Sequence, residues 1–163
     1  MERDRSRTVL NLQTLYEENL NSVYRVAYTY MHNSFDSEDA AQETFLRLAR
    51  FRGSFEDERQ IKAWLIVTVS NVCKDMLRRR YRQDAELEDV RGLAAPPEIE
   101  SELLTAVRAL PDRLRTVIFL YYYEGYTVEE IAAALHRPEG TVKSWLHRAR
   151  RRLRESLEVD DDE

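Results

Sequence analysis

The stretch TVEEIAAALHRPEGTVKSWLHRARRRL, residues 127–153, decides the fold expected for the second half of this chain. Its first nine residues predict a short helix, because Thr127 and Glu130 have the spacing of a capping box and apolar residues follow at helical intervals. The segment HRPEG, residues 136–140, interrupts this pattern, and a second helix follows it. Two helices joined by so short a turn form a helix-turn-helix, whose second helix enters the major groove of DNA. The residues expected to pack these helices are Ile131, Ala132, Leu135, Val142, Leu146, Ala149, Leu153 and Leu157.

Positive charge is concentrated in the second of these helices, although the whole chain has a formal net charge of −5. Residues 137–154 contain seven Arg or Lys residues and one acid, Glu139, whereas the next nine residues contain six acids and no base. Charge sorted in this way is typical of a segment that meets an oppositely charged partner. Duplex DNA is the favoured partner; the alternative is a solvated basic face on an ordinary helical hairpin. The outer face, with short groups for base edges and arginines for phosphates, consists of Thr141, Lys143, Ser144, His147, Arg148 and Arg151.

Composition limits the class of protein. With 163 residues, the chain is long enough for one ordinary domain or two small ones. It has only four Gly and four Pro residues, too few for a turn-rich all-β protein. A single cysteine, Cys73, excludes an internal disulfide and a cysteine-based zinc site. The N-terminus does not resemble a signal peptide and no apolar run approaches membrane-spanning length, so we expect a soluble, cytoplasmic protein.

Residues 1–83 predict three helices. A second helix is expected to begin with Ser37 as N-cap and acids in its first turn, and a third to run from about residue 59 to 82 after the polar loop RGSFEDE, residues 52–58. The apolar stripe of the first helix is Leu12, Tyr16, Leu20, Val23, Ala27 and Tyr30, and that of the second is Ala41, Phe45 and Leu48.

After residue 83 the sequence becomes acidic and contains Gly92 and the pair Pro96-Pro97, which predicts an exposed, flexible linker. Helices are then expected over residues 103–110 and 112–123, before the helix-turn-helix. We therefore predict an all-α protein with a helical domain at 1–83, a linker at 84–100, a second helical domain at 101–157 and an acidic tail at 158–163.

The first domain carries two charged segments. Asp36, Glu38, Asp39 and Glu43 lie close together, but as a surface patch they suit partner docking better than a metal cage. The third helix is basic toward its C-terminal end, and Phe51, Phe55 and Trp64 lie near its start. Basic groups beside aromatic rings can hold single-stranded DNA; the alternative is that Phe55 and Trp64 belong to the core.

Four segments together resemble the bacterial RNA polymerase sigma factors of the extracytoplasmic-function (ECF) group. They are DSEDAAQETFLRLAR, IKAWLIVTVSNVCKDMLRRR, LPDRLRTVIFLYYYEGYTVEEIAAAL and PEGTVKSWLHRARRRL, in the order of the family and covering nearly all of residues 12–157. The resemblance implies a region 2-like helical bundle that opens the −10 promoter element and a region 4-like helix-turn-helix domain that reads the −35 element.

The resemblance also implies roles for particular residues. Core polymerase would be bound by Asp39, Gln42, Glu43 and Leu46. The −10 element would be bound by Phe55, in a loop that captures a flipped base, and by Asn71, Lys74, Arg78 and Arg79. Arg137 would join the outer-face residues in contacting the −35 element.

The partners implied are core RNA polymerase, through its β′ clamp helices and β flap, promoter DNA, and an anti-sigma factor that is often membrane-bound. No cofactor, metal or small-molecule substrate is expected, and the chain would not be an enzyme. One alternative is a stand-alone helix-turn-helix regulator that binds operators as a dimer. Another is a nuclease that uses the acids between Asp36 and Glu43, although the sequence lacks the histidines and glycine-rich loops of such sites.

Overall fold

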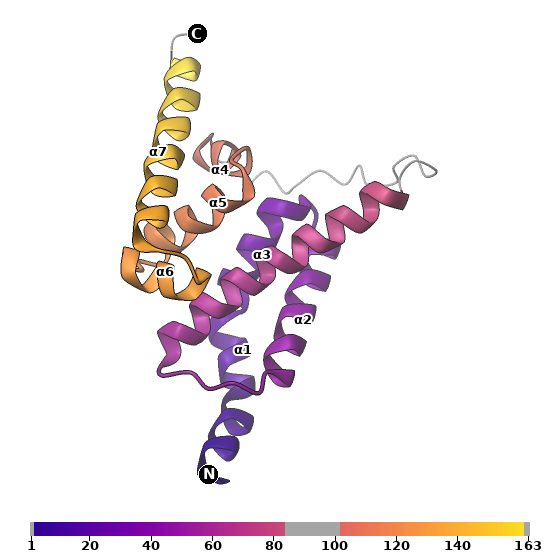
Figure 1. The fold of residues 1–163 in the computed structure, drawn as a ribbon. Coiled ribbons are helices and arrows are strands. Elements are labelled where there is room, and N and C mark those ends of the chain that lie inside the picture. The colour runs from indigo at the N-terminus through magenta and orange to yellow at the C-terminus, as the bar shows by residue number, and fades with distance from the viewer. Residues whose placement is uncertain (1, 84–101, 162–163) are drawn as a thin grey trace. The chain divides into compact units, whose positions relative to one another are not determined.

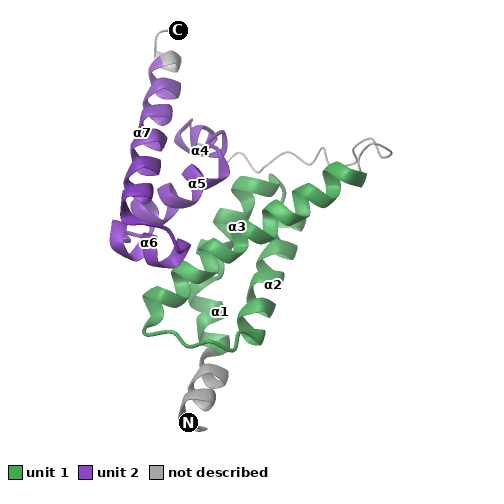
Figure 2. Cartoon of the chain, viewed as in Figure 1, with its two compact units in different colours: residues 1–83 green, residues 84–163 purple. Residues whose placement is uncertain are grey.

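The computed structural model describes residues 2–83 and 102–161, with side chains described for 12–83 and 102–158. The described residues contain helices and no strand, which confirms the all-α prediction. The chain divides into two compact units, residues 1–83 and 84–163 (Figure 2). The predicted linker lies outside the described residues. None of the described helices is both long and apolar enough to cross a membrane.

Unit 1 is a bundle of three helices, α1 (Glu2–Met31), α2 (Ser34–Arg50) and α3 (Glu58–Gln83), each of which packs against the other two (Figure 1). Its core contains Val23 and Tyr28 of α1, Phe45 of α2, and Leu65 and Val69 of α3. These helices contain few breakers, and their apolar faces cover one another, which is where most helical stability in proteins arises.

The apolar stripe predicted for α1 is correct only in its C-terminal half. Val23, Ala27 and Tyr30 are buried, but the ring of Tyr16 is 39% exposed and packs edge-on against Phe45 at 4.8 Å between centroids. Leu15 is buried at this level of the helix instead. Near Leu15 and Tyr16 the bundle therefore covers a different side of α1 than the stripe indicated.

The start of α2 differs from the prediction. Asn33, not Ser37, is the N-cap: its backbone is extended, and its side-chain oxygen accepts a hydrogen bond from the Asp36 N–H at 2.8 Å. Ser37 is already helical and buried, and its hydroxyl donates to the carbonyl of Asn33 at 2.6 Å. Asn is as good an N-cap as Ser, and here it lies directly after the left-handed residue His32 that ends α1.

Unit 2 contains α4 (Glu102–Arg108), α5 (Asp112–Ile118), a π-helical segment η2 (Phe119–Tyr123), α6 (Val128–Leu135) and α7 (Glu139–Asp161) (Figure 1). The helix predicted over 112–123 is therefore α-helical only in its first part. In the wider turn the Glu124 N–H reaches back to the Phe119 carbonyl at 3.1 Å. Gly125 follows with φ of 71° and ends the segment.

A buried arginine joins α4 to α5. The guanidinium of Arg115 donates hydrogen bonds to the carbonyl oxygens of Arg108 at 2.6 Å and Leu110 at 3.1 Å. Those carbonyls lie at the C-terminal end of α4, where the helix has no backbone donors of its own and favours positive charge. Arg115 thus fixes the corner that sets α5 against α7.

Candidate nucleic-acid and protein interfaces

The turn between α6 and α7 is built by local hydrogen bonds. Thr127 and Glu130 form the predicted capping box, in which each side chain bonds to the backbone N–H of the other at 3.1 Å. At the other end of α6, His136 adopts a left-handed conformation with φ of 54° and the Arg137 N–H bonds to the Ala132 carbonyl at 3.0 Å. Such a helix end needs one residue at positive φ and turns the chain sharply. The two helices form the predicted helix-turn-helix.

One side of α7 is packed and the opposite side is basic. Val142, Leu146 and Ala149 are buried, and Leu153 and Leu157 are half-buried. Of the residues predicted to face DNA, Thr141 is half-buried and the exposed ones are Arg137, Lys143, Ser144, His147, Arg148 and Arg151.

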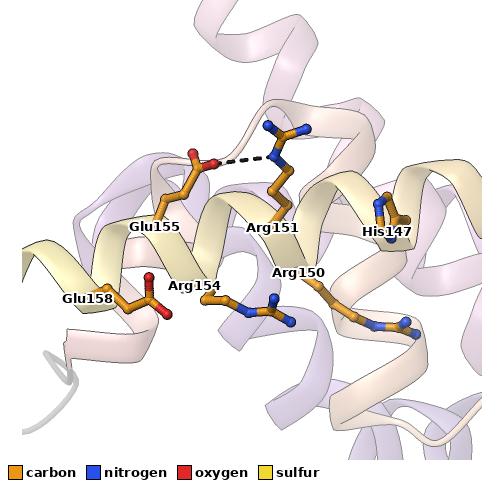
Figure 3. Close-up of a pocket in the computed structure, with 6 residues that line it drawn as sticks. All are labelled: His147, Arg150, Arg151, Arg154, Glu155 and Glu158. Atoms are coloured by element: carbon orange, nitrogen blue, oxygen red, sulfur yellow. Dashed lines mark hydrogen bonds and ion pairs between the residues drawn. The ribbon is translucent and has the colours of Figure 1, made fainter.

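The exposed surface of α7 changes sign along its length. Figure 3 shows His147, Arg150, Arg151 and Arg154 projecting from the helix, followed toward its C-terminal end by Glu155 and Glu158. Arg151 pairs with Glu155 at 3.3 Å, and both side chains remain largely exposed, so this pair is weak. The basic part lies next to the turn, and α7 continues through Asp161.

Aromatic rings hold three arginines around this basic surface. Arg150 donates to the hydroxyl of Tyr122 at 2.5 Å and lies 5.6 Å from the ring centre of Tyr121. Trp145 has the guanidinium of Arg113 at 5.8 Å and that of Arg137 at 6.0 Å from its ring centre. Arg113 and Arg150 were not among the predicted site residues. The contacts of Arg113 with Trp145 and of Arg150 with Tyr122 each join segments far apart in the chain, so helical spacing in the sequence does not predict them.

In unit 1 the loop before α3 and the second turn of α3 together form a cluster of three aromatic rings. Phe51 stacks on Phe55 at 4.7 Å and lies 5.2 Å from Trp64, and Phe55 meets Trp64 edge-on at 5.9 Å. Phe55 and Trp64 are half-buried and Phe51 is exposed. The cluster presses closely on the backbone, since a Cβ on Gly53 would lie 2.5 Å from the ring of Phe51. Packed rings with an open side are a surface on which a base can stack.

The basic residues of α3 form a stripe beyond this cluster. Asn71, Arg78 and Arg79 are exposed and Lys74 is half-buried, and helical spacing places Asn71, Lys74 and Arg78 on one side. Arg80 does not belong to this exposed stripe. Its guanidinium makes a bidentate ion pair with the buried carboxylate of Asp36, one arm of which is 2.6 Å long.

The outer face of α2 carries the residues that the sequence assigned to polymerase binding. Asp39 and Gln42 are exposed, Leu46 is 50% exposed, and Glu43 is half-buried and pairs with Arg47 at 3.3 Å. Phe35, one turn before Asp39, is 71% exposed and extends this face, although it was not predicted.

The titratable groups on and near α2 include one tyrosine, Tyr24 of α1, with a shifted pKa. No group of three His, Cys, Asp or Glu residues among those described could hold a metal ion. Burial, with a smaller contribution from the Glu38 carboxylate and then from Tyr28, raises the pKa of the Tyr24 hydroxyl, which therefore stays neutral at neutral pH.

Comparison with known proteins places both units in one family. Residues 15–83 match sigma-70 region 2 and residues 100–153 match sigma-70 region 4. The ECF RNA polymerase sigma factor SigW of Bacillus subtilis is 31% identical over 154 residues, which cover 83% of this chain and 82% of SigW. The ECF RNA polymerase sigma factor SigE of Mycolicibacterium smegmatis is 35% identical over 155 residues, which cover 88% of this chain and 60% of SigE.

Solved structures show the same similarity. The sigma factor RpoE from Bartonella quintana, in complex with the anti-sigma factor NepR, has a TM-score of 0.61 at 25% identity, covering 98% of this chain and 99% of RpoE. CnrH in complex with the cytosolic domain of CnrY has a TM-score of 0.65 at 22% identity, covering 96% of this chain and 98% of CnrH, and supports the fold alone.

Proposed function

The chain belongs to the ECF RNA polymerase sigma factors, and on that basis we propose that its two units bind core polymerase and recognise a promoter at two separate elements. The observation that carries this proposal is the pairing of an exposed acidic face on α2 with an exposed basic face on α7, one in each unit. A subunit that catalyses no reaction itself would use the acidic face of α2 to bind the polymerase and the basic face of α7 to bind DNA. The relatives are sigma factors, so the stand-alone dimeric regulator is not retained.

Unit 2 is proposed to read the −35 element as duplex. Lys143, Ser144 and His147 lie in the first turns of α7, where the second helix of a helix-turn-helix reaches base edges. Arg148 and Arg151 lie farther along the same face and suit phosphates. The buried residues opposite them hold α7 at a fixed angle to the rest of the unit, which duplex recognition requires.

Unit 1 is proposed to hold the melted −10 element. The rings of Phe51, Phe55 and Trp64 offer a stacking surface for an unpaired base, and the stripe of Asn71, Lys74 and Arg78 continues from it along α3 with positive charge for the backbone. Arg79 is exposed one residue beyond this stripe and would contact the same strand.

The exposed face of α2 is proposed to dock on core polymerase, at the β′ clamp helices, while unit 2 contacts the β flap. Acids around an exposed leucine combine charge steering with apolar contact, which is the usual composition of a specific interface. The solved relative with an anti-sigma factor bound supports a further partner of that kind for this chain, acting in the cytoplasm.

Transcription from sheared genomic DNA by bacterial core polymerase, with and without the protein, tests the proposal. Sequencing of transcript 5′ ends should show new start sites that share an upstream pair of elements at fixed spacing. Starts without any shared upstream element, or no new starts although the protein binds core, would contradict promoter recognition.

Charge reversal on α2 tests the docking face. The double change Asp39→Arg/Glu43→Arg should weaken binding to core polymerase by about ten-fold or more, because like charges then meet in a matched interface. The control Glu17→Arg/Glu18→Arg makes the same change in net charge on the exposed side of α1 and should have little effect. Binding is measured by fluorescence titration of labelled protein with core; equal losses in both variants would refute the assignment.

A further inference from the structure

Two exposed arginines share one tryptophan ring beside the basic face of α7. Arg113 lies in the first turn of α5, Arg137 lies in the turn before α7, and Trp145 lies in the second turn of α7. Their guanidinium carbons are 5.8 Å and 6.0 Å from the centre of the ring. Three separate segments of unit 2 therefore converge on this half-buried side chain.

This arrangement gathers positive charge without neutralising it. Within the part of the chain that the structure describes, no ion pair joins either Arg113 or Arg137 to a carboxylate, and both side chains are exposed. A ring contact at an exposed site is weak and leaves the charge of each guanidinium available. An anion that bound beside Trp145 would therefore be attracted by both positive charges.

The position of Trp145 along α7 identifies the anion. Trp145 follows Thr141 by four residues and precedes Arg148 by three, so it lies next to both on the helix surface. A helix that reads base edges in the major groove has a row of backbone phosphates along each of its sides. The side of α7 that bears Trp145 therefore faces one such row when the reading face is in the groove.

We propose that Arg113, Arg137 and Trp145 form a binding site for a backbone phosphate of duplex DNA, in which the two guanidiniums contact the phosphate and Trp145 is the residue that positions them. This inference rests on the proposed function, since it takes the outer face of α7 as the DNA-reading face. It adds Arg113, from a different helix, to the DNA contacts and gives Trp145 a role. On the other side of α7, Arg150 is held by Tyr121 and Tyr122 in a comparable way.

Salt dependence of duplex binding tests the site. Binding of the full chain, assembled with core polymerase, to a labelled 30-bp duplex is measured across NaCl concentrations, once with the mapped upstream element and once with mixed sequence. Arg113→Ala should reduce the slope of log affinity against log salt concentration by about one. It should also lower the affinity for both duplexes by the same factor, because a phosphate contact carries no sequence information. Arg25→Ala, which removes the same charge from an exposed position in unit 1, should leave the slope unchanged.

Variants of Trp145 separate positioning from packing. Trp145→Phe keeps an aromatic face and should retain most of the affinity, whereas Trp145→Leu keeps apolar bulk and should lose about three-fold or more, the equivalent of the cation–ring contacts. Melting temperatures of unit 2 show whether either variant merely unfolds it. Equal affinity of Phe and Leu variants at equal stability would overturn the positioning role.

The failure of this site and that of the proposed function give different results. If Arg113→Ala leaves both slope and affinity unchanged while Arg151→Ala lowers them, the phosphate site is wrong and duplex reading by α7 stands. If the assembled wild-type chain directs transcription from specific starts but its affinity for duplex does not respond to salt, the phosphate site is also wrong. If the chain does not bind core polymerase, the proposed function itself fails.

Discussion

Asp36 shows how a single long-range contact changes what a carboxylate does. In the sequence it belongs to an acidic run, but in the structure it is buried and its carboxylate accepts a hydrogen bond from the side-chain amide of Asn33 and pairs with Arg80. Its backbone N–H donates to the side-chain oxygen of Asn33. The pair joins the first turn of α2 to the last turns of α3. It therefore stabilises the end of α3 that presents Arg78 and Arg79.

Removing the charge of Asp36 should destabilise unit 1 strongly. Asp36→Asn leaves the guanidinium of Arg80 partly buried without its anion, and breaking such a pair costs about 3 kcal/mol of unfolding free energy. Urea unfolding is followed by Trp64 fluorescence in a Trp145→Phe background. Glu43→Gln, which removes the more exposed ion-pair partner of Arg47 in the same unit, is the matched control and should cost less than about 0.5 kcal/mol; similar losses in both variants would contradict the argument.

The helix ends show which local structure the sequence can specify. The α6 capping box was predicted correctly because both of its hydrogen bonds join residues three apart, so the pattern contains the whole interaction. The N-cap of α2 was predicted at the wrong residue, since Ser37 and Asn33 are both suitable and the choice depends on where α1 ends. The π-helical turn at 119–123 has no local signature in the sequence.

The capping box of α6 gives a prediction of its own. Thr127→Ala removes the acceptor for the Glu130 N–H and should lower the unfolding free energy of unit 2 by about 1 kcal/mol. Thr127→Ser keeps the hydroxyl and should retain most of the unfolding free energy that the alanine variant loses. Unfolding is followed by Trp145 fluorescence in a Trp64→Phe background, and an alanine variant as stable as the serine variant would show that the cap does not matter.

The candidate site was predictable where it depends on one helix and unpredictable where helices meet. The exposed faces of α2, α3 and α7 follow from helical spacing, and the structure leaves most of their predicted residues exposed. Pairs such as Arg80 with Asp36, 44 residues apart, and Arg150 with Tyr122, 28 residues apart, depend on how helices pack. The packing also adds Arg113, which lies on a different helix from the Trp145 ring that it contacts.

Considered as a whole, the chain combines a basic face on α7 with an acidic total charge. Its formal net charge is −5, although residues 137–154 alone carry +6. Phosphate attraction dominates nonspecific DNA binding, and charges within about a Debye length contribute most. If α7 reads duplex as proposed, the acids that follow in the sequence from Glu155 onward would weaken binding to arbitrary duplex more than contacts at base edges.

Neutralising the acidic end of the chain should therefore increase nonspecific binding. Replacing the four acids Asp160, Asp161, Asp162 and Glu163 by their amides changes the net charge from −5 to −1. At low salt this variant should bind mixed-sequence duplex roughly three-fold or more tightly than the wild type, and the gain in affinity should disappear as the salt concentration rises. The control neutralises four exposed acids of unit 1, Glu17, Glu18, Glu38 and Glu56, and changes the net charge equally. Binding is measured by fluorescence anisotropy at several NaCl concentrations. A larger gain from the acidic end would show that its place in the sequence after the basic residues matters, whereas equal gains would mean that only total charge limits nonspecific binding.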